Sequence, residues 1–371
     1  MKLALPGAAA LIVAHIAGMV DLVALPVWVG ALQTRYGFSL QQAGGLATLF
    51  LLGAVLASVI VATRLNRANQ RVVASLGFAM AAVAFLAAST QTLYAPLAAL
   101  HAIAGVSVGA ALSMIHGAIG RSENPHRLFA FAGIGLGLFA VVFLGGVPLL
   151  IAASGGAALF VVFAAVMAVA AVVTAMLFAA PEAAPVSARK TPLTGTVWFL
   201  IAGVSLMTFN QAMVFSFVEV IGGARGFTTE AVMGVLIALG LVNLAFPAPL
   251  AAVLEKRLVA FRVVQIGPAV QAALAMGITF ATIFPLWAPA AATFVAVQIF
   301  VHTFAFGLLA RHDRTGRAVA ATPAMLMIGS ALGPFIGGAL SQNLGFPALG
   351  LAAIVVAAAS ITCFTHARTT A

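Results

Sequence analysis

One acidic residue lies deep inside a hydrophobic stretch near the start of the chain. Asp21 stands near the middle of an apolar run from about residue 7 to residue 32, which is long enough to cross a bilayer as a helix. A charged aspartate that faced lipid would cost at least ~2.5 kcal/mol. We therefore expect Asp21 to face the protein interior or a wet cavity, and to exchange a proton there. The alternative is a structural aspartate held by a neighbouring hydroxyl or amide group.

Several later hydrophobic stretches also carry polar side chains at membrane depth. An imidazole can gain or lose a proton near physiological pH, and amide groups can bind an uncharged solute. No Lys or Arg occurs at this depth, so the sequence offers no clamp for a phosphate or dicarboxylate. A neutral, weakly cationic or lipophilic substrate is therefore favoured. These polar residues are His101, His116, Asn210, Gln211, Gln298 and His302.

Two polar residues lie near the ends of their stretches. We expect His116, close to the cytoplasmic end of its stretch, to be an interfacial residue. Glu219 lies near the outer end of its stretch, where it either attracts a cation or sits at the level of the lipid headgroups. The headgroup position is the prediction that we carry forward.

The composition defines the class of protein. Of the 371 residues 64% are hydrophobic and 6% are charged, and the mean hydropathy is +1.19, which is typical of a polytopic membrane protein. The net charge of +10 does not indicate a nucleic-acid binder, because the basic residues are scattered among short loops. Cys363 is the only cysteine, which excludes an intrachain disulfide. The first apolar run is too long for a signal peptide and carries Asp21 and Pro26, so we interpret it as a membrane helix.

Hydrophobic segments of spanning length divide the chain into two groups of six. A polar linker at residues 181–195 separates an N-terminal six-helix bundle, residues 1–180, from a C-terminal one, residues 196–371. The predicted spans lie at about residues 8–32, 40–62, 72–90, 95–119, 128–151, 156–180, 196–221, 229–253, 262–284, 288–310, 318–341 and 346–365.

The basic residues predict the orientation of these spans. When the loops are assigned alternately to two sides, every Lys and Arg except Arg35 and Arg225 falls on one side. The positive-inside rule then places both termini and the central linker in the cytoplasm. The Ala-rich composition favours a bacterial inner membrane.

Short matches between the two halves indicate an internal duplication. Gly37, in Tyr-Gly-Phe-Ser after the first span, corresponds to Gly226, in Arg-Gly-Phe-Thr after the seventh. The same separation of 189 residues relates Asp21 to Asn210. Such a repeat predicts two pseudo-symmetric bundles with the substrate site between them, near the midplane.

On these features the chain resembles the major facilitator superfamily of secondary transporters. The loop after the second span, residues 62–71, keeps Arg67 and Arg71 of that family's loop signature but has lost its acid and both glycines. The glycine and proline signature of the drug/proton antiporters, Gly-x-x-x-Gly-Pro-x-x-Gly-Gly, occurs here at residues 329–338 in span 11 instead of span 5. The resemblance implies an all-α membrane protein with twelve transmembrane helices, nearest in pattern to the antiporters.

The resemblance also implies roles for individual residues, because spans 1, 4, 7 and 10 line the cavity in this family. Asp21 is then the proton carrier, helped by His101, which replaces an arginine of the antiporter pattern. Gln271 lies outside those four spans. The alternative to a functional role is simple packing for Gln298, His302, Phe217 and the glycines. For the arginines, the alternative is that they are ordinary positive charges of cytoplasmic loops. The implied substrate-binding residues are Trp28, Asn210, Gln211, Met213, Phe217, Gln298 and His302, and the implied gating residues are Arg67, Arg71, Gly333 and Pro334.

The leading functional hypothesis is a proton-coupled exporter of small lipophilic, neutral or cationic compounds that works by alternating access. An importer of a small neutral or organic metabolite, as a symporter or uniporter, is the alternative, and a sensor that binds without transport is also open. We find no residue cluster that a membrane-embedded enzyme would need, and we expect no metal or cofactor. The expected partners are a small-molecule substrate, protons and the lipid bilayer, with no nucleic acid, and the expected state is a monomer.

Overall fold

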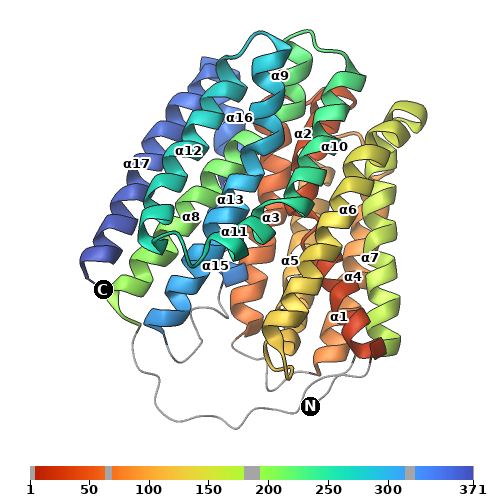
Figure 1. Cartoon of the computed structure of the whole chain (residues 1–371). Helices are drawn as coiled ribbons and strands as arrows, with labels where there is room; N and C mark the ends of the chain where they lie inside the picture. Colours follow the sequence, from red (N-terminus) through yellow and green to blue (C-terminus); the bar gives the residue numbers. More distant parts are fainter. Residues whose placement is uncertain (1–4, 63–68, 179–192, 314–321, 371) are drawn as a thin grey trace. The chain divides into compact units, whose positions relative to one another are not determined.

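The chain folds entirely into helices in the parts that can be described. The computed structural model describes residues 5–62, 69–178, 193–313 and 322–370, and no strand occurs among them. Twelve helical segments in these ranges are long and apolar enough to cross a membrane (Figure 1). The predicted all-α fold with twelve spans is therefore confirmed.

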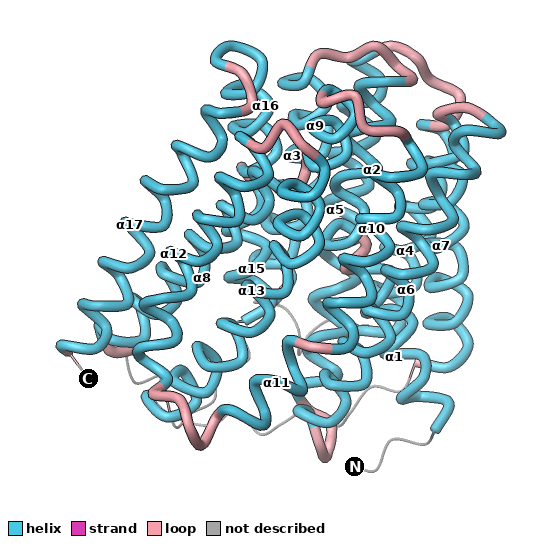
Figure 2. The backbone as a smooth tube through the Cα atoms, turned by 45° about the horizontal axis from the view of Figure 1, so that its top comes forward, coloured by secondary structure: helices cyan, strands magenta, loops and turns pink. Residues whose placement is uncertain are grey.

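Where the connections are described, short loops join consecutive helices (Figure 2). The apolar residues favour helix formation because every backbone group of a helix is paired within its own segment, as a bilayer requires. The helices are α1 (Leu5–Gly18), α2 (Asp21–Thr34), α3 (Leu40–Ala62), α4 (Gln70–Ala88), α5 (Tyr94–Gly120), α6 (Pro125–Ser154), α7 (Ala157–Leu177), α8 (Gly195–Phe215), α9 (Val218–Ala224), α10 (Thr229–Ala245), α11 (Pro247–Leu254), α12 (Ala260–Phe280), α13 (Phe284–His312), α15 (Thr322–Ala331), α16 (Gly333–Leu344) and α17 (Pro347–Thr369).

Four spans consist of two helices each: α1 with α2, α8 with α9, α10 with α11, and α15 with α16. Proline accounts for two of these breaks. Pro247 and Pro334 occupy the first turns of α11 and α16, where a proline is tolerated because its missing N–H has no partner in the helix anyway. The hydropathy pattern predicted continuous spans at all four places.

Left-handed glycines mark equivalent turns in the two halves of the sequence. Gly37 and Gly226, which the repeat pairs, have φ angles of 69° and 80°. Gly155 and Gly345 follow spans 5 and 11, and their φ angles are 84° and 80°. Glycine adopts this conformation without the steric cost that a Cβ imposes. The shared geometry supports the predicted duplication.

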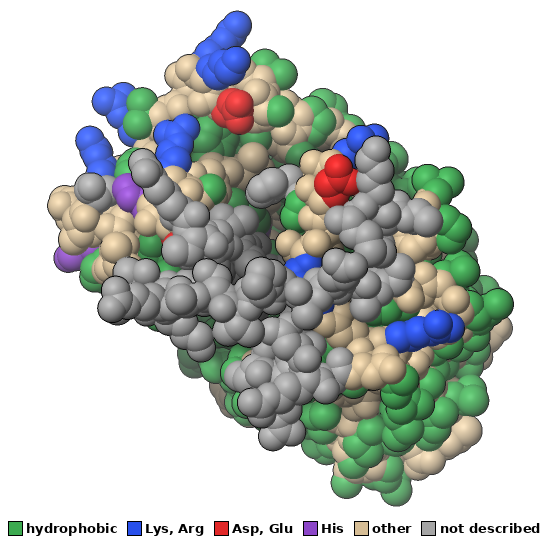
Figure 3. All heavy atoms as spheres, turned by 90° about the horizontal axis from the view of Figure 1, so that it is seen from below, with side chains coloured by type: hydrophobic (Ala, Val, Ile, Leu, Met, Phe, Trp, Pro, Cys, Tyr) green, Lys and Arg blue, Asp and Glu red, His purple; other side chains and the backbone are tan. Residues whose placement is uncertain are grey.

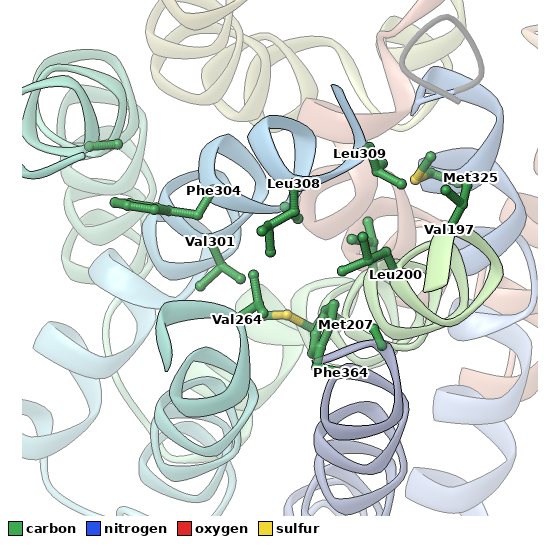
Figure 4. Close-up of a cluster of buried hydrophobic side chains, with 14 residues drawn as sticks. Val197, Leu200, Met207, Val264, Val301, Phe304, Leu308, Leu309, Met325 and Phe364 are labelled. Carbon is green, nitrogen blue, oxygen red and sulfur yellow. The ribbon is translucent and has the colours of Figure 1, made fainter. Parts of the chain in front are cut away.

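The helices form two compact units. The first unit comprises Met1–Ala24, Thr34–Gly37 and Leu49–Lys190, and the second comprises Leu25–Gln33, Phe38–Thr48 and Thr191–Ala371. The division at residues 180 and 196 stays a prediction, and most of the predicted linker lies outside the described residues. In the second unit, apolar side chains of α8, α12, α13 and α17, among them Leu200, Val264 and Phe364, form a buried core (Figure 4).

Candidate functional site

Asp21 is a fully buried acid at a helix break. It is the first residue of α2, directly after the interruption at Met19 and Val20, and its exposed fraction is 0%. Neither carboxylate oxygen has a hydrogen-bond partner on another side chain in the described part of the chain. The N-terminal end of a helix is partly positive, which favours a carboxylate. The site therefore accommodates Asp21 but gives it no fixed counter-ion among these residues.

The backbone at this break is tightened. The N–H groups of Leu22 and Val23 donate to the carbonyls three residues earlier, at 3.2 and 3.1 Å, instead of four residues earlier. Such a 3₁₀-like stretch within a helix is typical of a hinge or a functional site. On the preceding turn, Gly18 lies against Leu112 of α5, where a Cβ would overlap the leucine side chain. Span 1 thus approaches span 4 closely just before the acid.

His101 lies in an aromatic environment within the first unit. Its Nδ1 hydrogen-bonds to the carbonyl oxygen of Leu97 at 2.7 Å, one turn earlier in α5. The imidazole stands edge-on to the rings of Phe85 and Phe160, with centroid distances of 6.2 and 5.5 Å. These contacts support a packing role for His101, and its assistance to Asp21 stays a prediction.

A second histidine environment in the first unit was missed by the sequence reasoning. His15 Nδ1 and His116 Nε2 are 3.0 Å apart, so a hydrogen bond joins spans 1 and 4, and Phe129 of α6 packs against both rings. His116 is thus half-buried beside another histidine, and its position at the membrane interface stays a prediction. Their presence on two spans that line the cavity in the resembled family was the available signal.

A chain of polar side chains connects three helices of the second unit. Asn210 Nδ2 of α8 donates to Gln271 Oε1 of α12 at 3.3 Å, and Gln271 Nε2 donates to Gln298 Oε1 of α13 at 2.8 Å. Gln298 Nε2 in turn contacts His302 Nε2, one turn along α13. All four side chains are buried. We call this set the amide–histidine chain.

The structure brings together three residues that the sequence proposed for substrate binding, Asn210, Gln298 and His302, and adds Gln271. Asn210 Oδ1 and the neighbouring Gln211 Oε1 are buried with no hydrogen-bond partner in the described ranges. Unpaired acceptors of this kind are costly in an apolar interior, so they can bind a donor group of a solute. The amides carry no formal charge, which suits an uncharged or weakly cationic ligand.

Other predicted binding residues lie in tight helix packing. Met213 and Phe217 are fully buried, and both lie against Gly337 of α16, where a Cβ would overlap them. Gly333 likewise lies against the backbone of Met213. Trp28 is fully buried within the second unit. For these three side chains the contacts support packing, and solute contact stays a prediction.

The glycine and proline signature of span 11 also brings α16 close to α3. Gly338 lies against the Leu40 carbonyl, and Gly44 lies against the backbone of Pro334. Thr48 Oγ1 accepts a hydrogen bond of 3.1 Å from the backbone N–H of Phe335. Small residues thus allow the direct helix contact that membrane interfaces favour.

The arginine signature is only partly described. Arg71 Nε donates to the carbonyl oxygen of Ala175 near the end of α7, at 2.7 Å, and so satisfies one of the free carbonyls there. Arg67 lies outside the described residues. The gating roles of both arginines stay predictions.

Glu219 lies in the last part of span 7, where a neighbouring helix covers it, and its position at headgroup level stays a prediction. It is half-buried in the first turn of α9, and a Cβ on Gly30 of α2 would lie 2.8 Å from its carboxylate carbon. Its Oε2 is buried without a hydrogen-bond partner among the described residues. Hydropathy placed Glu219 near a span end, but it could not show that another helix covers it.

The described residues contain no group of three or more His, Cys, Asp or Glu side chains that could hold a metal ion.

The sequence profile of the Major Facilitator Superfamily matches residues 10–312. The chain belongs to the major facilitator superfamily. This family assignment indicates a transporter rather than an enzyme.

Solved structures share the fold at low sequence identity. A bacterial homologue of the human lysosomal transporter Spinster, in its inward-facing and occupied conformation, has a TM-score of 0.75 and 16% identity, with 98% of this chain and 96% of the other covered. The inward-facing and unoccupied conformation gives a TM-score of 0.67 and 16% identity, with 98% and 94% covered. A comparison with curated protein sequences found no significant match.

Proposed function

We propose that this transporter couples solute movement to protons, with Asp21 as the proton carrier, and that it exports small lipophilic, neutral or cationic compounds. The fold itself supports secondary transport by alternating access. Proton coupling, direction and substrate class are the parts that we add.

The burial of Asp21 is the observation that carries the coupling proposal. A fully buried carboxylate without a side-chain partner is unfavourable when charged and much less so when protonated. A conformation that buries the acid therefore favours proton uptake, and one that exposes it to water favours release. The break in span 1 next to Asp21 supports such a change, because discontinuous helices supply coupling sites in secondary transporters.

The amide–histidine chain supports a solute site in the second unit. We propose that Asn210, Gln298 and His302 contact the solute, that Gln271 positions two of them, and that the unpaired Gln211 oxygen accepts a hydrogen bond from it. His101 assists the proton carrier in this proposal. Trp28, Met213 and Phe217 form apolar walls.

The remaining proposals concern the gate and the membrane. Gly333 and Pro334 allow span 11 to bend at the break between α15 and α16, and Arg67 and Arg71 stabilise one access state. We also propose that the protein lies in the inner membrane of the cell as a monomer. Both of its termini then lie in the cytoplasm. Lys and Arg side chains project from the face drawn in Figure 3, in keeping with a cytoplasmic surface.

The test uses purified protein in proteoliposomes that contain a pH-sensitive dye, challenged with a panel of lipophilic amines and neutral compounds. Wild type is compared with Asp21→Asn, which keeps the shape of the side chain but cannot release a proton. Glu230→Gln is the matched control, because Glu230 is an exposed acid in the first turn of α10. We expect a compound to trigger proton flux in wild type and in the control but not in Asp21→Asn.

The sign of the flux decides the direction. Proton movement opposite to the compound supports export, whereas movement in the same direction supports the importer alternative. Full proton-coupled transport by Asp21→Asn would exclude Asp21 as the carrier. Compound movement without any proton flux in wild type would show a uniporter or coupling to another ion.

A further inference from the structure

A large apolar cavity opens in the second unit, and the residues that line it differ from those of the proposed solute site. Its volume is about 790 Å³, within the range of roughly 300–1,000 Å³ that small-molecule sites occupy. It lies among α10, α11, α12, α13 and the loop that joins α11 to α12, and none of the amide–histidine chain lines it.

The bend in span 8 helps to form this cavity. Span 8 is interrupted at Phe246, and α11 departs from the direction of α10 (Figure 1). Phe246 and Pro247 at the bend, Ile266 of α12 and Phe300 of α13 line the space. Phe246 is 61% exposed and Ile266 is 59% exposed. Apolar side chains left open in membrane-spanning segments face lipid, so the cavity can admit a hydrocarbon chain from the bilayer.

One part of the lining is basic. Arg257, in the loop before α12, and Arg262, in the first turn of α12, both line the cavity and are exposed. Among the described residues that line it, none is acidic. Guanidinium groups bind phosphate oxygens in pairs, and basic pockets between spans on the cytoplasmic side bind anionic lipid headgroups.

We propose that this cavity binds an anionic phospholipid from the bilayer. The phosphate of the headgroup binds between Arg257 and Arg262, and an acyl chain fills the apolar space past Phe246 and Ile266. The charge of the two arginines selects an anionic headgroup over a zwitterionic one, and the apolar lining selects a lipid over a free phosphate. The proposal does not depend on proton coupling or on the identity of the transported solute.

Native mass spectrometry of the detergent-purified protein tests this site with defined lipids. The probes are phosphatidylglycerol, phosphatidylcholine with the same acyl chains, and glycerol phosphate without chains. We expect wild type to bind phosphatidylglycerol more tightly than either other probe. The double variant Arg257→Gln/Arg262→Gln should lose about thirtyfold in affinity for phosphatidylglycerol, because each basic residue near an anionic lipid contributes ~1 kcal/mol.

Two further variants separate the site from general surface charge. Lys256→Gln/Arg311→Gln removes the same charge from exposed residues that do not line the cavity, and it should leave the affinity within about twofold of wild type. Ala296→Phe places a large side chain in the cavity and keeps both arginines. It should therefore weaken the binding of phosphatidylglycerol but not that of glycerol phosphate. Gel filtration confirms the fold of each variant. If Ala296→Phe does not fold, the comparison of the Arg257/Arg262 variant with the Lys256/Arg311 variant decides.

Three results would overturn the proposal. Equal affinity for phosphatidylcholine would show that the charge plays no part. An equal loss in the Lys256/Arg311 variant would show a diffuse surface effect. Binding of glycerol phosphate as tight as that of phosphatidylglycerol would identify an anion site without a lipid chain.

Discussion

Gln271 links Asn210 of α8 to Gln298 of α13, so replacing it tests how much the amide–histidine chain contributes to stability. Its side chain accepts from Asn210 at 3.3 Å and donates to Gln298 at 2.8 Å, and it is fully buried. Gln271→Met keeps the length of the side chain but removes both hydrogen bonds. Gln298 Oε1 then has no donor from α12.

The expected loss of stability follows from these two distances. Interhelical hydrogen bonds in membrane proteins average ~0.6 kcal/mol and reach ~1.7 kcal/mol. The bond of 2.8 Å to Gln298 has normal geometry, whereas the bond of 3.3 Å to Asn210 is long. An unpaired buried oxygen adds a penalty of roughly 1–3 kcal/mol unless water reaches it. We expect Gln271→Met to lower the free energy of unfolding by about 2 kcal/mol.

Reversible unfolding in mixed detergent micelles measures this loss, and a double-mutant cycle with Gln298→Met isolates the shared bond. The interaction energy should be about 1 kcal/mol. Gln265→Met on the same helix is the control, because Gln265 is only half-buried and its hydrogen bond to Thr365, at 3.0 Å, lies at the surface. We expect its effect to stay within about 0.5 kcal/mol. An interaction energy near zero would refute the reasoning. Equal losses of stability in Gln271→Met and Gln265→Met would refute it as well.

Two glycine substitutions test the packing and the turns. Gly338→Ala should lower the free energy of unfolding by roughly 1–3 kcal/mol, because the new methyl group overlaps the Leu40 carbonyl, whereas Gly133→Ala has open space and should be neutral or stabilising. Gly226→Ala should cost roughly 1–2 kcal/mol because φ is 80° there, and Gly223→Ala, in the preceding helix, should not. The same unfolding assay checks both pairs, and a reversed order within either pair would contradict the geometry.

The sequence predicted the spans because apolar length is a strong signal. All twelve spans appear where the hydropathy placed them. The breaks were not predicted. Pro334 gave a reason to expect a bend in span 11, whereas Gly18 was the one signal directly before the interruption of span 1, and glycine is common in membrane helices. A glycine alone therefore did not distinguish a broken span from a continuous one.

The polar residues of the candidate site could be found, but not their partners. Periodicity placed Gln298 beside His302 because both lie on one helix, and it could not pair Gln271 of α12 with them. The same limit applies to His15 with His116 and to Glu219, which Gly30 covers. Contacts within a helix follow from spacing, whereas contacts between helices depend on rotation and tilt that the hydropathy pattern leaves open.

The repeat gives Asp21 and Asn210 equivalent positions, yet the two halves use that position differently. In span 1 the helix is interrupted just before Asp21, and the acid has no side-chain partner among the described residues. In span 7 the helix continues past Asn210 and breaks only at Ser216 and Phe217, so Asn210 stays in a regular turn and hydrogen-bonds to Gln271. An ionisable group at a helix break can change its charge when water reaches it, whereas an amide fixed by neighbouring helices holds a constant geometry. In the function that we propose, the duplicated position therefore supplies a group that exchanges a proton in one half and a rigid, neutral group that binds the solute in the other.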